Sequence, residues 1–368
     1  MFIGKLKVKD RRYFAIGGFR IPYEVHTEVW EGYKRYYVRL FFFEFCYRKE
    51  KYVPPEKRPE DMYRYYADSP ITSFLAEGKI TYELKRIHCE QRAYKQLGYF
   101  PDLDDPKTLN EKIIWLALNY RNPDIAVAAD KAKAKEWAGS RVGYDHVVPM
   151  IGAYENAMDI DFESLPKRFV AKLNGGWGAE KVMIVKDKSK LDTDRIRAIF
   201  SSWLYPWNIY YYRNMCVTDE KLEKPLIVIE EFIGDEEKGL DDYKFYCSRG
   251  EIKFALIVSG RGGDGESRVF VDENGEILPF ARKGKGSSDS VELPLEFEKM
   301  KEISRKLSSS FPFVRVDLYD VDGHIYVGEM TFTPGMFLRF EPGEWDLKLG
   351  EMVDISEEIA SLGDGKKE

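Results

Sequence analysis

A β-hairpin signal near the C-terminus fixes how two strands of this chain must pair. Residues 313–330 contain two alternating apolar runs, FVRVDLY and HIYVGEM, separated by a turn sequence with Asp322-Gly323. An Asp-Gly pair between such runs is typical of a two-residue hairpin turn, and the turn sets the register of the strands beside it. Pairing about this turn brings Asp317 near Glu329. The sequence therefore predicts two carboxylates on one sheet face.

Other polar residues are expected to join these carboxylates. Arg315 lies two residues before Asp317, which places both on the same side of their strand. Thr331 follows the second run, so hard oxygen ligands of the kind that Mg²⁺ prefers converge on one region. One interpretation is a place for a metal ion and a phosphate. The other is a solvated sheet face with cross-strand ion pairs.

A glycine-rich segment lies between two further apolar runs. In RFVAKLNGGWGAEKVMIVK, residues 168–186, a β-like run ends near Lys172, glycines follow, and a second run starts at Val182. Glycine lets backbone N–H groups approach a phosphate closely, and Lys172 would add a point charge. The pattern is neither a Walker loop nor a Rossmann fingerprint, because a strand and not a helix follows. An ordinary glycine-rich hairpin is the alternative.

A third candidate region is the strand-like run PLIVIEEFIGD at residues 225–235. A strand that leads into a connection between lobes can present its backbone to an adenine edge and a carboxylate to the exocyclic amine. Further along, Asp242 and Lys244 occupy alternate positions of a strand and therefore share a face. The alternative for each of these charges is an ordinary place on the protein surface.

Composition limits the class of protein. The chain has 368 residues, and with 44% hydrophobic and 33% charged residues it can build a packed core. The net charge of −6 argues against a dedicated nucleic-acid-binding protein, which usually carries a basic surplus. No apolar run approaches the length of a membrane span, and the first residues do not resemble a secretory signal. We therefore expect a cytoplasmic protein with no membrane span and no nucleic-acid partner.

Local signals divide the chain into regions of different character. A capping box at Thr108 and Glu111 precedes an amphipathic helix, Asn122-Pro123 ends it, and DIAVAADKAKAKEWA predicts the next helix. Five regions are expected: a mostly β, aromatic-rich start, a helical part, a small lobe with the glycine-rich loop, a large lobe with the carboxylates, and a tail. Their bounds are residues 1–70, 71–165, 166–233, 234–352 and 353–368.

Aromatic residues are unusually frequent and unevenly distributed. They make up 15% of the chain, and a third of them lie in residues 1–66. This start either forms a β-sheet with buried rings, which alternating aromatics favour, or recruits an acidic polymer through its basic surplus. A second run, WLYPWNIYYYR at residues 203–213, is interpreted either as packing or as a platform for sugar rings.

Taken in chain order, these pieces resemble an ATP-grasp enzyme, and more closely the TupA-like branch, over roughly residues 100–350. The resemblance rests on seven segments in the expected order: PKTLNEKIIWLALNYRNP, ADKAKAKEW, DIDFESLPKRFVAKLNGGWG, IVKDKSKLD, IVIEEFIGD with DYKFYCSRGEIKF, FPFVRVDLYDVDGHIYVGEMTFTPG, and EWDLKLGEM. The branch is associated with teichuronopeptide and other surface-polysaccharide synthesis. It implies an α+β fold in which two lobes grip ATP, with the aromatic-rich N-terminal region as an addition.

The resemblance also implies roles for individual residues. Lys172 and Lys244 match cations that reach the nucleotide phosphates, and Arg315 matches a basic residue beside the metal; these three are the expected catalytic residues. The expected ATP-binding set is Lys172, Asn174, Gly175, Gly176, Gly178, Glu230, Glu231, Phe232, Ile233, Asp242 and Lys244. Asp317, Glu329 and Thr331 match the magnesium ligands. Many relatives have Asn where this chain has Thr331, and a His is expected where it has Gly175.

By the logic of this family, the protein is a carboxylate–amine ligase that uses ATP and Mg²⁺. A substrate carboxylate attacks the γ-phosphate, and an amine then displaces phosphate from the acyl-phosphate. The expected substrates are an amino acid and a uronic acid or amino sugar, with a polysaccharide or a lipid-linked glycan as the larger partner. Two other functions stay open: a kinase of a hydroxyl or carboxylate group without amide formation, and a non-catalytic nucleotide-binding protein.

Overall fold

The structure of the protein is a computed structural model. The chain divides into two units, Met1–Ile80 and Thr81–Glu368, and every candidate site residue belongs to the second. The residues that the structure describes are 6–16, 19–30, 33–40, 43–51, 82–176, 181–204, 224–234, 240–260, 266–282, 288, 290–334 and 338–364.

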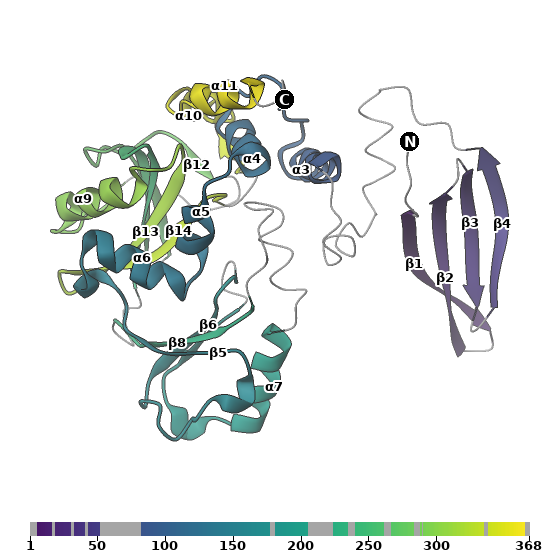
Figure 1. Cartoon of the computed structure of the whole chain (residues 1–368), viewed down its shortest axis with the longest axis horizontal. Coiled ribbons are helices and arrows are strands. Elements are labelled where there is room, and N and C mark those ends of the chain that lie inside the picture. Colours follow the sequence, from purple (N-terminus) through teal and green to yellow (C-terminus); the bar gives the residue numbers. More distant parts are fainter. Residues whose placement is uncertain are drawn as a thin grey trace. The chain divides into compact units, whose positions relative to one another are not determined.

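The first unit contains a four-stranded antiparallel sheet in which each strand pairs with the next along the chain (Figure 1). Its strands are β1 (Leu6–Ile16), β2 (Phe19–Trp30), β3 (Tyr33–Leu40) and β4 (Phe43–Lys51). These segments are rich in β-branched and aromatic residues, which favour strands. The prediction of a β-rich start is therefore confirmed.

The described part of the second unit begins with helices α3 (Tyr82–Leu97), α4 (Leu109–Asn119), α5 (Pro123–Ala129) and α6 (Lys133–Val142). The predicted capping box is present at α4. The hydroxyl of Thr108 accepts a hydrogen bond from the N–H of Glu111, and the Glu111 carboxylate accepts one from the N–H of Thr108. Asn122 caps α5, as the Asn-Pro signal suggests.

The single helix expected from DIAVAADKAKAKEWA is a wrong prediction, because the chain turns between α5 and α6. Asp130 lies at this turn and is fully buried. Its carboxylate accepts hydrogen bonds from the N–H groups of Ala132 and Lys133, which satisfies the start of α6 and ends the previous helix. A second helix N-terminus is thereby created directly beside the glycine-rich loop.

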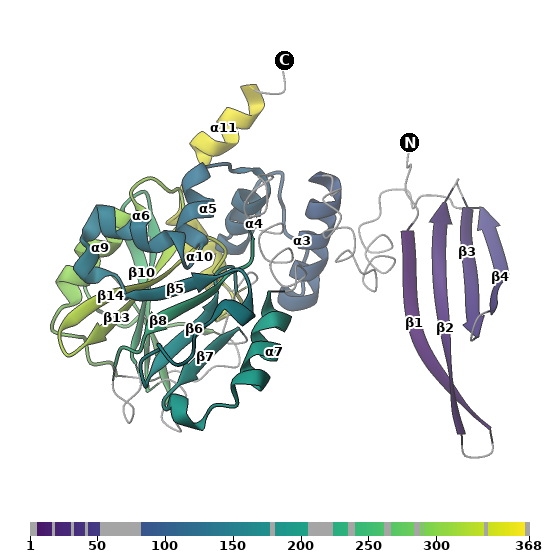
Figure 2. The ribbon, with the colours of Figure 1, turned by 60° about the horizontal axis from the view of Figure 1, so that its bottom comes forward.

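The small lobe is a four-stranded antiparallel sheet in the order β5-β8-β6-β7 (Figure 2). Its strands are β5 (Met150–Tyr154), β6 (Phe169–Leu173), β7 (Val182–Val185) and β8 (Ile227–Glu231), and short 3₁₀ turns lie at η1 (Tyr144–His146), η2 (Ala157–Asp159) and η3 (Lys188–Lys190). Helix α7 (Thr193–Trp203) packs on this sheet through Phe200 and Trp203. Trp203 is thus a core residue, whereas residues 205–213 of the aromatic run lie outside the described residues.

The large lobe is a five-stranded sheet in the order β11-β10-β9-β13-β14. Its strands are β9 (Asp242–Ser248), β10 (Glu251–Ser259), β11 (Ser267–Val271), β13 (Val314–Val321) and β14 (His324–Thr331). Asp322 and Gly323 both have positive φ, at 52° and 84°, as a type I′ hairpin turn requires. The predicted hairpin is confirmed.

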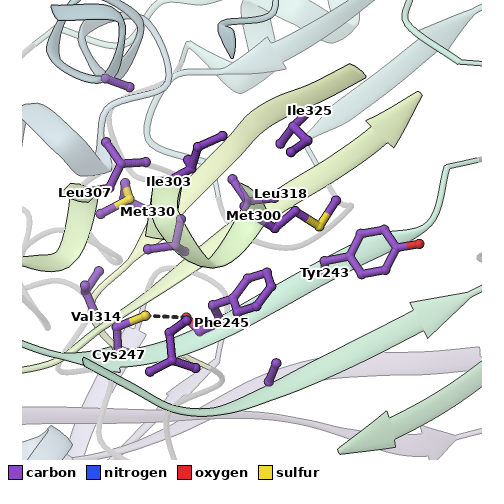
Figure 3. Packing of buried hydrophobic residues seen from close by; sticks show 14 of the residues in the cluster. Tyr243, Phe245, Cys247, Met300, Ile303, Leu307, Val314, Leu318, Ile325 and Met330 are labelled. Atoms are coloured by element: carbon purple, nitrogen blue, oxygen red, sulfur yellow. Dashed lines mark hydrogen bonds between the residues drawn. The ribbon is translucent and has the colours of Figure 1, made fainter. Parts of the chain in front are cut away.

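Helix α9 (Phe297–Ser308) covers one face of the large sheet (Figure 3). Met300, Ile303 and Leu307 recur at helical spacing and pack against Phe245 and Leu318 of the strands. Helices α5 and α6 contribute to the same core through residues such as Trp137. These helices are therefore anchored to the sheet that carries the hairpin carboxylates.

A second core joins the beginning and the end of the second unit. Helix α4 packs against α10 (Trp345–Glu351), near the short pair β12 (Ala281–Arg282) and β15 (Phe340–Glu341), and α11 (Ser356–Asp364) follows. Asp346 accepts hydrogen bonds from Asn110 and from the hydroxyl of Tyr99, and the Asn110 side chain in turn binds both backbone groups of Leu338.

None of the helices that the structure describes has the length and apolar character needed to cross a membrane.

Candidate active site

Two carboxylates lie opposite each other on the hairpin of β13 and β14. Asp317 pairs with Glu329 in the strand register, and Arg315 pairs with Thr331, so the pairing predicted from the turn is confirmed. Asp317 is buried, with 2% of its surface exposed, whereas the Glu329 side chain is 28% exposed. Asp317 is thus enclosed by the protein, whereas Glu329 is partly exposed to solvent.

A bulge beside Glu329 sets the direction of this residue. The strand pairs step from Asp317–Glu329 to Leu318–Val327, so Gly328 is an extra residue in β14. A Cβ atom at Gly328 would lie 2.6 Å from the ring of Tyr319, closer than real Cβ contacts. Glycine is therefore required here unless the ring moves.

Asp317 is held by two cations. Arg315 donates from Nε and Nη2 to the two carboxylate oxygens, at 2.5 and 2.7 Å, and the Nζ of Lys244 lies 2.6 Å from Oδ2. Lys244 also pairs with Asp242 at 2.5 Å, and Arg315 donates to the hydroxyl of Thr331 at 3.0 Å. Burial would raise the pKa of Asp317, but the charges of Arg315 and Lys244 outweigh it and hold that pKa below its ordinary value. The carboxylate is therefore ionised.

Glu329 pairs with a lysine to which the sequence analysis gave no role. The Nζ of Lys131 lies 3.2 Å from Glu329 Oε1 and donates to the carbonyl of Gly176 at 2.5 Å. Lys131 stands in the turn between α5 and α6 that Asp130 creates. This one ammonium group therefore touches both the hairpin carboxylate and the glycine-rich loop.

Asn174 anchors the start of the glycine-rich loop. It is fully buried, and its side-chain amide donates to Asp130 at 2.8 Å and accepts from the N–H of Leu226 at 3.0 Å. Its carbonyl accepts from the N–H of Lys131 at 3.0 Å. Gly175 and Gly176 follow this anchor, whereas residues 177–180, with Gly178, lie outside the described residues. The loop therefore starts from a fixed point beside Lys131.

Glu230 at the end of β8 is shared by two lysines. Its Oε2 lies 2.5 Å from Lys172 of β6, and its Oε1 lies 2.9 Å from Lys135 of α6. Burial would raise the pKa of Glu230, but Lys172 and Lys135 outweigh it and hold that pKa below its ordinary value. Burial lowers the pKa of Lys135. The three charges form one buried cluster between the lobes.

The connection after β8 leads away from this cluster. Glu231 is exposed at its side chain, and its N–H donates to the carbonyl of Pro149 at 3.0 Å. Phe232 and Ile233 are half-buried, and the guanidinium of Arg168 lies 5.2 Å from the Phe232 ring. The predicted adenine hinge therefore directly follows the charged cluster in the chain.

Glu230 of the small lobe and Glu329 of the large lobe line the same open hollow. Its charged lining is Lys131, Lys135, Glu230 and Glu329, and alanines of α5 and α6 supply small apolar walls. Lys131 and Lys135 are functional candidates that sequence reasoning missed. The available signal was the lysine-rich segment ADKAKAKEW itself, in which Lys131 precedes the start of α6 and Lys135 lies in its first turn.

The donor set of the hairpin suits Mg²⁺ with a nucleotide. Mg²⁺ prefers oxygen ligands and is usually bound through one or two carboxylates together with substrate phosphates. Asp317 and Glu329 supply two ionisable carboxylates in direct opposition. Among the described residues there is no group of three or more His, Cys, Asp or Glu that could hold a metal ion by itself. The residues therefore fit a metal ion that arrives with phosphate ligands.

The sequence matches the model of the TupA-like ATP-grasp family over residues 111–354. This match covers most of the chain, and the protein belongs to this family. Its fold is accordingly the α+β ATP-grasp fold, as the sequence segments indicated. The sheet of the first unit lies outside the matched residues.

Several solved structures are similar to this chain. D-alanine–D-alanine ligase from Bacillus anthracis is 17% identical, with 67% of this chain and 71% of that chain covered and a TM-score of 0.40. The ATP-grasp ligase PsnB with its minimal precursor is 13% identical, with coverages of 58% and 54% and a TM-score of 0.33. D-cycloserine synthetase DcsG is 14% identical, with coverages of 62% and 70% and a TM-score of 0.34. These similarities are too low to say anything about substrates. No curated protein matches the sequence.

Proposed function

We propose that the protein is an ATP-dependent ligase that joins a carboxylate to an amine through an acyl-phosphate. The observation that carries this proposal is the concentration of paired charges in the site, where the opposed carboxylates Asp317 and Glu329, together with Glu230, are bound by a set of cations. The cations are Lys131, Lys135, Lys172, Lys244 and Arg315. Membership of the TupA-like ATP-grasp family supports the same chemistry. Phosphoryl transfer depends mainly on such positioning and charge stabilisation.

In this proposal the small lobe and the connection after β8 bind the nucleotide. The backbone of residues 231–233 meets the adenine edge, and Glu230 accepts a hydrogen bond from the exocyclic amine. Lys172, which comes from the neighbouring strand, then turns from Glu230 to the phosphates. The N–H groups of the glycine loop, which starts at Asn174, cover the phosphates, and Asp242 contacts the ribose.

The large lobe provides the place where the phosphoryl group is transferred. Asp317 and Glu329, with the hydroxyl of Thr331, would hold Mg²⁺, which supplies charge neutralisation on the transferring group. Arg315 and Lys244 keep Asp317 ionised and stabilise the negative charge that develops nearby. A substrate carboxylate oxygen bonds to the γ-phosphorus, the bond from this phosphorus to the β,γ-bridging oxygen breaks, and ADP leaves.

The second step makes the amide bond. The amine nitrogen bonds to the carbonyl carbon of the acyl-phosphate, the carbon–oxygen bond to the phosphate breaks, and the proton lost by the amine passes to the departing phosphate. We propose an amino acid as one substrate and a uronic acid or amino sugar as the other, as part of a polysaccharide or a lipid-linked glycan. The association of the TupA-like branch with surface polysaccharides supports this choice of substrate.

ADP release from the purified full chain, screened over pairs of amino acids and uronic acids or amino sugars, tests the proposal. We expect ADP and phosphate only when a carboxylate and an amine are both present, together with a product lighter than the sum of the two by one water. Asp317→Asn and Glu329→Gln are expected to abolish this turnover. A phosphorylated product without an amide would identify a kinase instead. No nucleotide turnover with any pair, together with no ATP binding by calorimetry, would contradict an ATP-dependent enzyme.

A further inference from the structure

Each lysine that lines the site is held by a carboxylate of the same site. Lys172 and Lys135 hold the two oxygens of Glu230, and Lys131 holds Glu329. Lys244 lies within 2.6 Å of both Asp317 and Asp242. The groups proposed to bind phosphate and the groups proposed to bind metal therefore neutralise one another when no ligand is bound.

This arrangement disfavours a metal ion that arrives by itself. A divalent cation at Asp317 and Glu329 would have to approach the ammonium groups of Lys244 and Lys131, which lie 2.6 and 3.2 Å from the carboxylate oxygens. The hydroxyl of Thr331, the third predicted metal ligand, already accepts a hydrogen bond from Arg315. Displacing a lysine without a new anion would leave a partly buried charge without its counter-ion, which is strongly unfavourable.

A triphosphate removes this obstacle, because its oxygens offer the lysines new partners. Each lysine can then exchange a carboxylate for a phosphate while the metal ion takes the carboxylate, so no charge is left without a partner at any stage. The exchange is least hindered at Glu329, because its ion pair with Lys131 is longer than the others and its side chain is the most exposed of the site's carboxylates. Since Lys131 also binds the carbonyl of Gly176, its departure would break this hydrogen bond to the start of the glycine-rich loop at the same time.

We infer that Lys131 closes Glu329 to metal ions in the nucleotide-free protein, so that metal and nucleotide bind only as a complex. The inference rests on the proposed function, because it assumes that the hollow binds ATP. Lys131 acts here as a positioning residue for Glu329 and for the glycine loop. The site would thereby reject free divalent cations and keep its carboxylates paired with its own cations until the nucleotide arrives.

Binding of Mn²⁺ to the full chain tests this inference without any turnover. Free Mn²⁺ is measured by electron paramagnetic resonance, with and without ADP, for the wild type and three variants. For the wild type we expect no saturable binding of Mn²⁺ alone and clear binding with ADP. For Lys131→Gln we expect the affinity for Mn²⁺ alone to rise about tenfold or more, within the usual range of coupling between sites.

Two matched variants separate the role of Lys131 from a general change in charge. Lys133→Gln removes the same charge at an exposed position two residues away, and we expect it to behave as the wild type. Lys131→Arg keeps a cation beside Glu329 and should also exclude Mn²⁺. Wild-type protein that binds Mn²⁺ alone as tightly as with ADP would overturn the inference, as would a Lys131→Gln variant with wild-type behaviour. Wild-type protein that binds neither ADP nor Mn²⁺·ADP would instead overturn the proposed function, and the inference with it.

Discussion

At the scale of single residues, Glu230 shows how a buried carboxylate of the site is held. Its side chain is 5% exposed, and each oxygen is bound by a different lysine, one from β6 and one from α6. Removing a buried carboxylate between two ammonium groups leaves both of them without their counter-ion. Removing one partner of a buried ion pair therefore lowers the free energy of unfolding by much more than the intact pair contributes to it.

Glu230→Gln is therefore expected to lower the free energy of unfolding by about 3 kcal/mol, the usual cost of breaking a buried ion pair from one side. Glu231→Gln is the matched control, since Glu231 is the next residue but has an exposed side chain. Its effect should stay within about 0.5 kcal/mol, as for most surface substitutions. Urea denaturation of the two variants and the wild type measures both values. Equal losses for the two variants would contradict the buried cluster.

The same carboxylate should make stability depend on pH. Its pKa lies below the ordinary value of 4.5 in the folded protein, so the unfolded chain takes up a proton first as the pH falls. The ionised Glu230 carboxylate thus adds its full contribution to the free energy of unfolding above pH 4.5. This contribution is lost as the pH falls from 4.5 through the lower pKa that Glu230 has in the folded protein. We expect the difference in unfolding free energy between wild type and Glu230→Gln to be constant near neutral pH and to shrink below pH 4.5. A difference that persists unchanged down to about pH 3 would contradict the lowered pKa.

At the scale of elements, the contact between α4 and α10 shows how the two ends of the second unit are tied together. Gly350 of α10 faces the backbone that enters α4. A Cβ atom there would collide with the carbonyl oxygen of Lys107 and lie 2.7 Å from the carbonyl carbon of Thr108. Because these are backbone atoms, a flexible side chain cannot move aside to make room. The helices approach this closely only because residue 350 is glycine.

Gly350→Ala is expected to destabilise the protein by about 2 kcal/mol or more, since overpacking forces the backbone to shift. Gly343→Ala is the control, because a Cβ atom at Gly343 would meet nothing within 4 Å. Thermal unfolding followed by circular dichroism compares the two variants. A lowered midpoint for Gly350→Ala alone is the expected result, and equal midpoints would argue against the close approach of α4 and α10.

Local signals in the sequence were enough to predict the elements whose bounds are set by neighbouring residues. The hairpin register followed from Asp322-Gly323, and the start of α4 followed from its capping box. The turn between α5 and α6 was missed because it depends on a distant partner. Asp130 caps α6 and also accepts a hydrogen bond from Asn174, which is 44 residues away in the chain. A helical pattern alone does not reveal such a contact.

Only part of the candidate site could be predicted, because the rest depends on contacts between residues far apart in the sequence. The opposition of Asp317 and Glu329 follows from one turn, so the sequence contained it. The ion pairs of Lys131 with Glu329 and of Lys135 with Glu230 join residues far apart in sequence. Nothing in the spacing of ADKAKAKEW names these partners, and only the packing of α5 and α6 against the large sheet brings them together.

At the scale of the whole molecule, the site belongs to one unit. Every described residue of the hollow lies in Thr81–Glu368, and the family match also lies within this unit. We therefore expect a chain that begins at residue 81 to bind Mg²⁺·ADP with the affinity of the full chain, as measured by calorimetry. Loss of binding in soluble, folded protein would show that the first unit takes part in nucleotide binding.

The central claim, an acyl-phosphate formed from a substrate carboxylate, is tested most directly by oxygen transfer. The active carboxylate–amine pair is supplied with ¹⁸O in the carboxylate, and the inorganic phosphate that is released is analysed by mass spectrometry. In the proposed mechanism the carboxylate oxygen that attacks the γ-phosphorus leaves with the phosphate. We therefore expect one ¹⁸O atom in each phosphate released with amide formation. Phosphate that carries no ¹⁸O, although amide is formed, would contradict the acyl-phosphate.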